Sequence, residues 1–137
     1  LPFKQTTEAE GFSTVTYSGN SQTIQGIEGV GFEPDFVWIK RRNTSKSHTL
    51  VDSVRGVNSA IFSDTTASED TSTDIFESFD SDGFTVGDDN LTNGAATYVA
   101  WCWDAGTGSA VSNTDGSITS TVKANTAKGF SKPLKWS

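Results

Sequence analysis

The feature that most restricts the fold of this chain is a series of short apolar runs separated by turn residues. Several of these runs alternate apolar and polar side chains, which is typical of half-buried strands. Gly residues and Asn-Gly or Asp-Gly pairs mark turns between them. No window keeps apolar residues at the i, i+3, i+4, i+7 spacing of an amphipathic helix for long enough to predict one. We therefore predict an all-β fold of about eight or nine short strands.

The runs have fairly regular spacing, which favours an antiparallel β-sandwich of the jelly-roll or lectin-like kind over an alternating βαβ sheet. The sequence "DSDG" at 80–83 predicts a tight hairpin turn. The polar segment 64–73 is expected to be an exposed loop. The expected strands fall within residues 12–18, 22–27, 35–42, 48–54, 59–63, 74–79, 84–87, 96–104 and 116–124.

The run 96–104 holds two tryptophans and the only cysteine of the chain. Alternation along a strand puts Val99, Trp101 and Trp103 on one face, and Tyr98, Ala100 and Cys102 on the other. Both faces are apolar, as they are in run 35–42, so we predict that Trp38, Trp101 and Trp103 are enclosed between two sheets. Cys102 is then a small buried hydrophobe and not a nucleophile. The alternative is an exposed aromatic platform that stacks on sugar rings, with Trp103 nearest to a loop.

The charge of the chain argues against a role in binding nucleic acid. Its net charge is −7, whereas affinity for phosphates comes from clustered Lys and Arg. No apolar run is long enough to span a membrane, and one cysteine allows neither an intrachain disulfide nor a thiolate zinc site. Residues 57–122 contain no Lys or Arg. This segregation predicts either a charged face that meets an oppositely charged neighbour or a solvated acidic region.

The sequence contains only weak patterns for catalysis or metal binding. His48 is the only histidine, and Asp52 lies on the same strand face, but no ordered triad follows from the sequence. A pair of carboxylates for glycoside cleavage can be drawn from Asp52, Glu77, Asp80 and Asp104, although acids are abundant here. The protein is therefore expected not to be an enzyme and to need no cofactor. The aspartates of "DSDGFTVGDDN" are either turn formers or calcium ligands, and they are Asp80, Asp82, Asp88 and Asp89.

Two basic features have open interpretations. Asp52 and Arg55 are expected to form a local charge pair near a strand end, with sugar or phosphate recognition by Arg55 as the alternative. The segment "KRRN" at 40–43 places three positive charges at another strand end. It is either solvated or in contact with an acidic neighbour or lipopolysaccharide phosphate.

A short internal repeat suggests how the chain is divided. "TEAEGFS" at 7–13 parallels "NTAKGFS" at 125–131, with an offset of 118 residues. Fixed offsets of this kind are a sign of tandem arrays. We expect an N-terminal extension or linker at 1–10, a β-sandwich domain at 11–124, and a C-terminal tail at 125–137 that resembles the start of a further repeat. The chain, which has no methionine, is expected to be processed or part of a longer protein.

Several segments together resemble a β-rich domain of virion proteins of tailed bacteriophages, familiar from phages of marine bacteria and cyanobacteria. These segments are "GVGFEPDFVWIKRRN", "HTLVDSVRG", "FDSDGFTVG", "TYVAWCWDAGTG" and "VSNTDGSITSTVKANTAKGFS". The resemblance covers nearly all of residues 11–131, and it departs at "KPLKWS", which does not continue into the usual next copy.

The resemblance implies a location in the virion and a structural or adhesive role, without catalytic residues. The expected protein is a non-catalytic module of a tail, fibre or capsid decoration that contacts other virion proteins, as a homo-oligomer or in a tandem array. The alternative is a carbohydrate-binding module that recognises host surface glycan.

Overall fold

The computed structural model describes residues 11–133, which form eleven strands in three antiparallel sheets and contain no helix. The all-β antiparallel prediction is therefore confirmed. One sheet has five strands, in the order β1 (Phe12–Ser18), β8 (Thr97–Trp103), β3 (Phe36–Arg41), β4 (Thr49–Asp52) and β5 (Gly56–Phe62). A second contains β2 (Gln25–Glu28), β7 (Gly83–Val86) and β6 (Ser78–Asp80). The third contains β11 (Phe130–Pro133), β10 (Ser120–Asn125) and β9 (Val111–Asn113).

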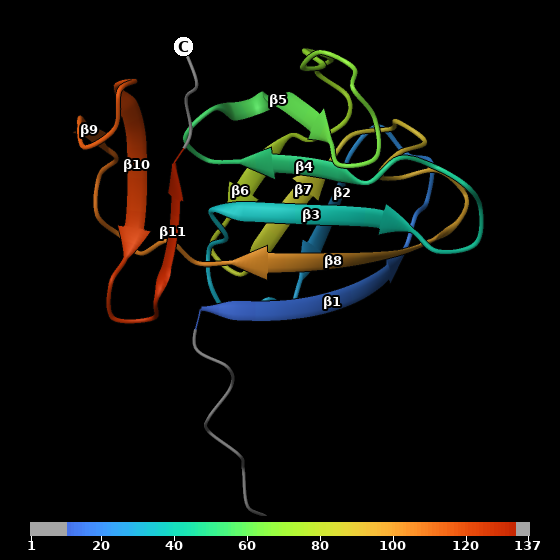
Figure 1. The fold of residues 1–137 in the computed structure, drawn as a ribbon. Helices are drawn as coiled ribbons and strands as arrows, with labels where there is room; N and C mark the ends of the chain where they lie inside the picture. The colour runs from blue at the N-terminus through green and yellow to red at the C-terminus, as the bar shows by residue number, and fades with distance from the viewer. Residues whose placement is uncertain (1–10, 134–137) are drawn as a thin grey trace, which may run out of the picture.

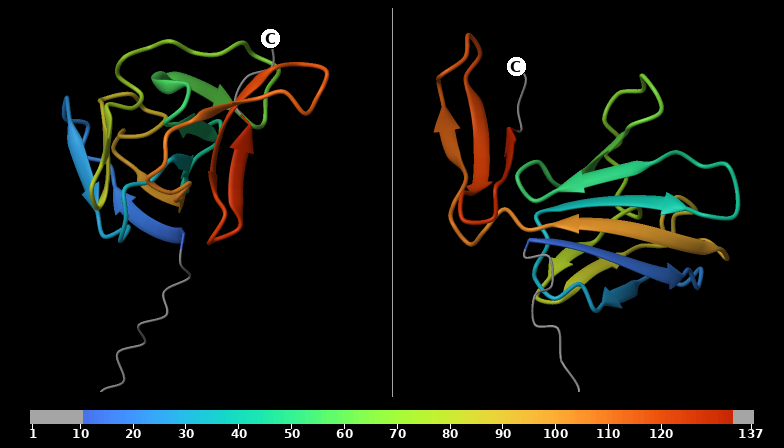
Figure 2. Two further views of the ribbon diagram at one scale, coloured as in Figure 1. Left: turned by 90° about the vertical axis from the view of Figure 1, so that its left-hand side faces the viewer. Right: turned by 60° about the horizontal axis from the view of Figure 1, so that its bottom comes forward.

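The five-stranded sheet and the β2–β7–β6 sheet face each other and form the β-sandwich, as Figures 1 and 2 show. Only the inner face of each sheet contributes to the core, because successive side chains of a strand point to opposite faces. Rings also meet across the gap, since Tyr17 of β1 lies 6.1 Å from Phe84 of β7. Core residues from the strands include Ile27, Val37, Ile39, Val51, Phe84, Val86, Tyr98, Ala100 and Cys102.

Most expected strands occur where the sequence places them, and the hairpin turn is confirmed by the pairing of Asp80 with Gly83. The expected strand 74–79 is largely wrong, because β6 begins only at Ser78. Ile75 and Phe76 are fully buried nevertheless, so their apolar character reflects the core and not a strand. The strands β9 and β11 were not expected.

The third sheet stands at one end of the sandwich, beside the start of β3 and the end of β8 (Figure 1). Its β11 lies within the segment expected to resemble the start of a further repeat. In this chain, Phe130–Pro133 pairs with β10, and the Phe130 ring stacks on Trp103 at 6.1 Å. The expected linker at 1–10 and the last four residues of the expected tail lie outside the described residues. Within residues 11–133, no helix is long and apolar enough to cross a membrane.

Candidate functional site

The outer face of the five-stranded sheet carries two rows of large apolar side chains. Strand register places Phe12, Trp103 and Phe36 side by side across β1, β8 and β3. The next row contains Trp101, Trp38 and Leu50, from β8, β3 and β4. We call these six residues the outer aromatic face.

The prediction that Trp38, Trp101 and Trp103 are enclosed between two sheets is wrong. All three are only partly buried, because the β2–β7–β6 sheet covers the opposite face, which carries Tyr98, Ala100 and Cys102. The prediction that Tyr98, Ala100 and Cys102 share a face in the core is correct, and Cys102 is fully buried. Burial raises the pKa of the Cys102 thiol to about 12, so the thiolate that a nucleophile requires is suppressed.

The two rows of the outer aromatic face differ in how far neighbouring rings cover them. Trp103 contacts Phe12 at 5.0 Å, Phe36 at 5.1 Å and Phe130 at 6.1 Å between ring centroids. Trp38 and Trp101 form an edge-to-face pair at 6.0 Å, and within residues 11–133 the only other ring paired with them is His48. Fewer rings therefore cover the Trp38–Trp101 pair than cover Trp103, although Phe12 in the row of Trp103 is itself 38% exposed.

His48 connects the aromatic face to the loop between β3 and β4. The indole N–H of Trp38 donates to Nδ1 of His48 at 2.9 Å. Because Nδ1 accepts this bond, the proton of the neutral imidazole lies on Nε2. His48 thus has a structural partner and also lines a surface hollow.

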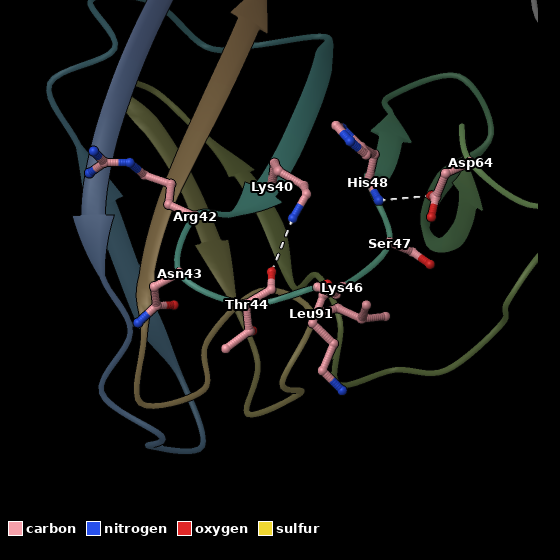
Figure 3. A pocket seen from close by; sticks show the side chains of 10 residues that line it. Lys40, Arg42, Asn43, Thr44, Lys46, Ser47, His48, Asp64 and Leu91 are labelled. Carbon is pink, nitrogen blue, oxygen red and sulfur yellow. Dashed lines mark hydrogen bonds between the residues drawn. The ribbon is translucent and has the colours of Figure 1, made fainter.

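The hollow has a volume of about 900 Å³ and opens widely to solvent at the end of the β3–β4 hairpin (Figure 3). We call it the basic hollow. Figure 3 shows the Lys40 amine pointing into the concave side of the loop, with Arg42 and Lys46 extending from either side. Its lining residues are Lys40, Arg42, Asn43, Thr44, Ser45, Lys46, Ser47, His48, Asp64 and Leu91.

Asp64 is the acidic residue of this lining, and its carboxylate is hydrogen-bonded to the backbone of the loop. Its carboxylate accepts a hydrogen bond of 3.0 Å from the backbone N–H of His48. This bond lowers the pKa of the Asp64 carboxyl. At the other end of the loop, the backbone N–H of Arg42 donates to Thr97 O at 2.8 Å. The loop that forms the basic hollow is therefore attached at both ends to neighbouring segments.

The aspartates considered as calcium ligands are not brought together. Asp80 and Asp82 lie at the turn before β7, whereas Asp88 and Asp89 follow its other end. Asp80 accepts hydrogen bonds from the hydroxyls of Ser78 and Thr85. Asp82 accepts two backbone N–H bonds, from Gly29 and Gly31. Across residues 11–133, no three His, Cys, Asp or Glu side chains are grouped so that they could hold a metal ion.

Three of the four acids considered for catalysis, Asp52, Asp80 and Asp104, also have structural partners, and Glu77 is partly buried. Asp52 pairs with Arg55 at 2.6 Å, which confirms the expected charge pair. It also accepts the backbone N–H groups of Val54 and Arg55. Asp104 accepts a bond from the backbone N–H of Gly106 and lies 3.4 Å from the Lys128 amine.

The sequence pointed to part of the site but not to its arrangement. The "KRRN" segment signalled a basic strand end, while Lys46 and the loop hydroxyls gave no separate signal. Whether the tryptophans lie in the core or on the surface depends on where the second sheet packs, because strand alternation does not reveal which face is covered.

The fold and site together define a β-sandwich domain with an open aromatic face and an adjoining basic hollow. The chain belongs to a family described as Domain of unknown function (DUF7483), whose model matches residues 7–133. No curated protein and no solved structure matches the chain.

Proposed function

We propose that this domain is a non-catalytic structural module of a tailed-phage virion, which acts through contacts with other virion proteins. The observation that carries the proposal is that four of the five residues considered for acid–base chemistry, which are His48, Asp52, Asp80 and Asp104, hold hydrogen bonds of the local structure. His48 accepts from Trp38, and Asp52 holds the turn that contains Arg55. Groups fixed in this way stabilise local structure, and the resemblance to virion domains supplies the setting.

A rigid core supports the same role. At one end of the sandwich, the Asn93 side-chain amide donates hydrogen bonds to the carbonyl oxygens of Gln22, 71 positions away, and of Gly87. The Tyr98 hydroxyl accepts from the N–H of Gly94 and donates to Asn90 O. Buried polar networks whose members are satisfied rigidify a fold, which suits a module that spaces or links larger parts.

The test is whether the protein is a component of particles and lacks hydrolytic activity. Antibody labelling of purified virions is expected to place the domain on the tail, a fibre or the capsid surface. The purified domain is expected to release no reducing ends from polysaccharides of the host. Polysaccharide cleavage by the isolated domain would reject the proposal.

A second candidate function, recognition of host surface glycan, is favoured by the position of Trp38 and Trp101 on the outer aromatic face. Aromatic rings present broad apolar surfaces, and polar side chains of the basic hollow lie next to them. Binding of the labelled domain to host cells, and its loss after the glycans are removed, would distinguish adhesion from a role confined to particle assembly.

A further inference from the structure

We propose that the basic hollow and the Trp38–Trp101 row form one site for an acidic polysaccharide. Its carboxylate or phosphate groups would meet the cations of the hollow, and its sugar rings would pack on the indoles. This inference rests on the second function proposed above, because it names the class of glycan that the domain recognises.

Cations without a carboxylate partner are concentrated in the hollow. Three of the ten Lys and Arg residues of this acidic chain, Lys40, Arg42 and Lys46, line it. Across residues 11–133, ion pairs with carboxylates are made by Arg55, Lys123 and Lys128, and none is made by these three. Asp64 is the acid of the lining, and its carboxylate bonds to the backbone N–H of His48 and not to one of these cations. A cluster in which cations outnumber the acid is complementary to an anionic partner.

The hollow is formed before any ligand binds. The Lys40 amine donates to the carbonyl oxygens of Arg41 and Thr44, at 2.5 and 3.3 Å. These two bonds hold its charge on the concave side of the loop and leave one of its three donors for a ligand. The attachments of the loop to Thr97 and Asp64 further restrict it. A site that is already ordered loses less conformational freedom on binding.

The cations of the hollow and the indole rings form one continuous surface. Lys40 follows Trp38 by two positions on β3 and so lies on the same face of the sheet. His48 contacts the Trp38 ring and lines the hollow. An extended polymer can contact both the cations and the indole rings, whereas a free anion contacts only the cations. This geometry therefore favours a charged polysaccharide over a small ion.

The test measures binding of four polymers to the purified domain by titration calorimetry. Polygalacturonate carries carboxylates, a phosphate-bearing mannan carries phosphates, dextran is neutral, and polyglutamate is acidic without sugar rings.

The variants are R42Q/K46Q for the hollow and Trp101→Leu for the rings. A charge-matched control, K128Q/K132Q, removes two positive charges from the β10–β11 hairpin of the third sheet. Circular dichroism establishes that each variant is folded, and the tryptophan emission of the unaltered protein reports ring contact without any substitution.

The expected result is that at least one acidic polysaccharide binds and perturbs the tryptophan emission. Binding should weaken at least tenfold in R42Q/K46Q and in Trp101→Leu, and change less than twofold in the control. The polymer that binds then identifies carboxylate or phosphate as the recognised group.

Three results would overturn the inference. If dextran binds and R42Q/K46Q has no effect, the ligand is a neutral glycan and the second proposed function stands. If polyglutamate binds as tightly as the polysaccharides and Trp101→Leu has no effect, the hollow takes an acidic protein. If no polymer binds, both glycan recognition and this inference are rejected, while the proposed structural role in the virion is unaffected.

Discussion

The Lys123 amine lies 2.5 Å from the Asp35 carboxylate, although the two residues are 88 positions apart in the chain. Asp35 precedes β3 in the sandwich, and Lys123 belongs to β10 of the third sheet. Asp35 also accepts bonds from the Ser53 hydroxyl and the backbone N–H of Ala105. One nearly buried carboxylate thus connects the third sheet to the end of the sandwich.

Replacing Asp35 by Ala is expected to destabilise the protein by about 2–3 kcal/mol. Breaking a fully buried pair costs about 3–5 kcal/mol, but the Lys123 side chain is 18% exposed and water screens part of its charge. The measurement is the free energy of unfolding in urea. Lys128→Met, which breaks the longer pair with Asp104, serves as the control and should cost under about 1 kcal/mol. Equal losses in the two variants would contradict the role assigned to Asp35.

Gly83 is expected to tolerate no side chain, because a methyl group there would overlap the carbonyl oxygen of Ile27 on the neighbouring strand β2. Gly83→Ala must push β2 and β7 apart and should cost about 2 kcal/mol or more. Gly108→Ala is the matched control, since nothing lies within 4 Å of its added carbon. Its unfolding midpoint in urea should be nearly unchanged, and a similar midpoint for Gly83→Ala would refute the close approach.

The thiol of Cys102 is expected to resist alkylation in the folded protein. At pH 8 a thiol with a pKa of about 12 holds roughly 1,000-fold less thiolate than one with the ordinary value of 9.0. Burial also blocks access of the reagent. A chromogenic disulfide reagent should therefore react slowly with native protein and rapidly, with one thiol per chain, in denaturant. Fast reaction without denaturant would show that the inner face of β8 is open.

Stability is expected to fall as the pH rises above about 9. The unfolded Cys102 thiol ionises near its ordinary pKa of 9.0, whereas the folded one ionises near 12. Unfolding therefore releases a proton between these values, at about 1.4 kcal/mol per pH unit. Burial also raises the pKa of Tyr17 well above 10.0, which adds a loss at higher pH.

The check is the unfolding free energy measured at intervals from pH 8 to pH 10. The Cys102→Ala variant lacks the thiol and should show a flatter decline over this range, even though its stability at pH 8 is lower. Parallel declines in the two proteins would exclude Cys102 as the source.

The sequence by itself determined most strands of the sandwich and the β6–β7 turn, because both depend on local chemistry. Phe12–Ser18 alternates and forms β1 over the expected residues, and "DSDG" closes the β6–β7 hairpin. Such patterns act within a few residues, where side-chain direction and turn geometry are set. The burial of Cys102 also followed from the apolar face that it shares with Tyr98 and Ala100.

Only the tertiary structure decided which apolar face of β8 became the core. Both faces carry large hydrophobic side chains, so strand periodicity could not rank them, and the β2–β7–β6 sheet covers just one. Trp38 and Trp101 lie on the outer face, next to a loop whose Lys40, Arg42 and Lys46 make no ion pair within residues 11–133. Those relationships depend on contacts between distant segments, such as Asp64 with His48 and Lys123 with Asp35, which local sequence does not encode.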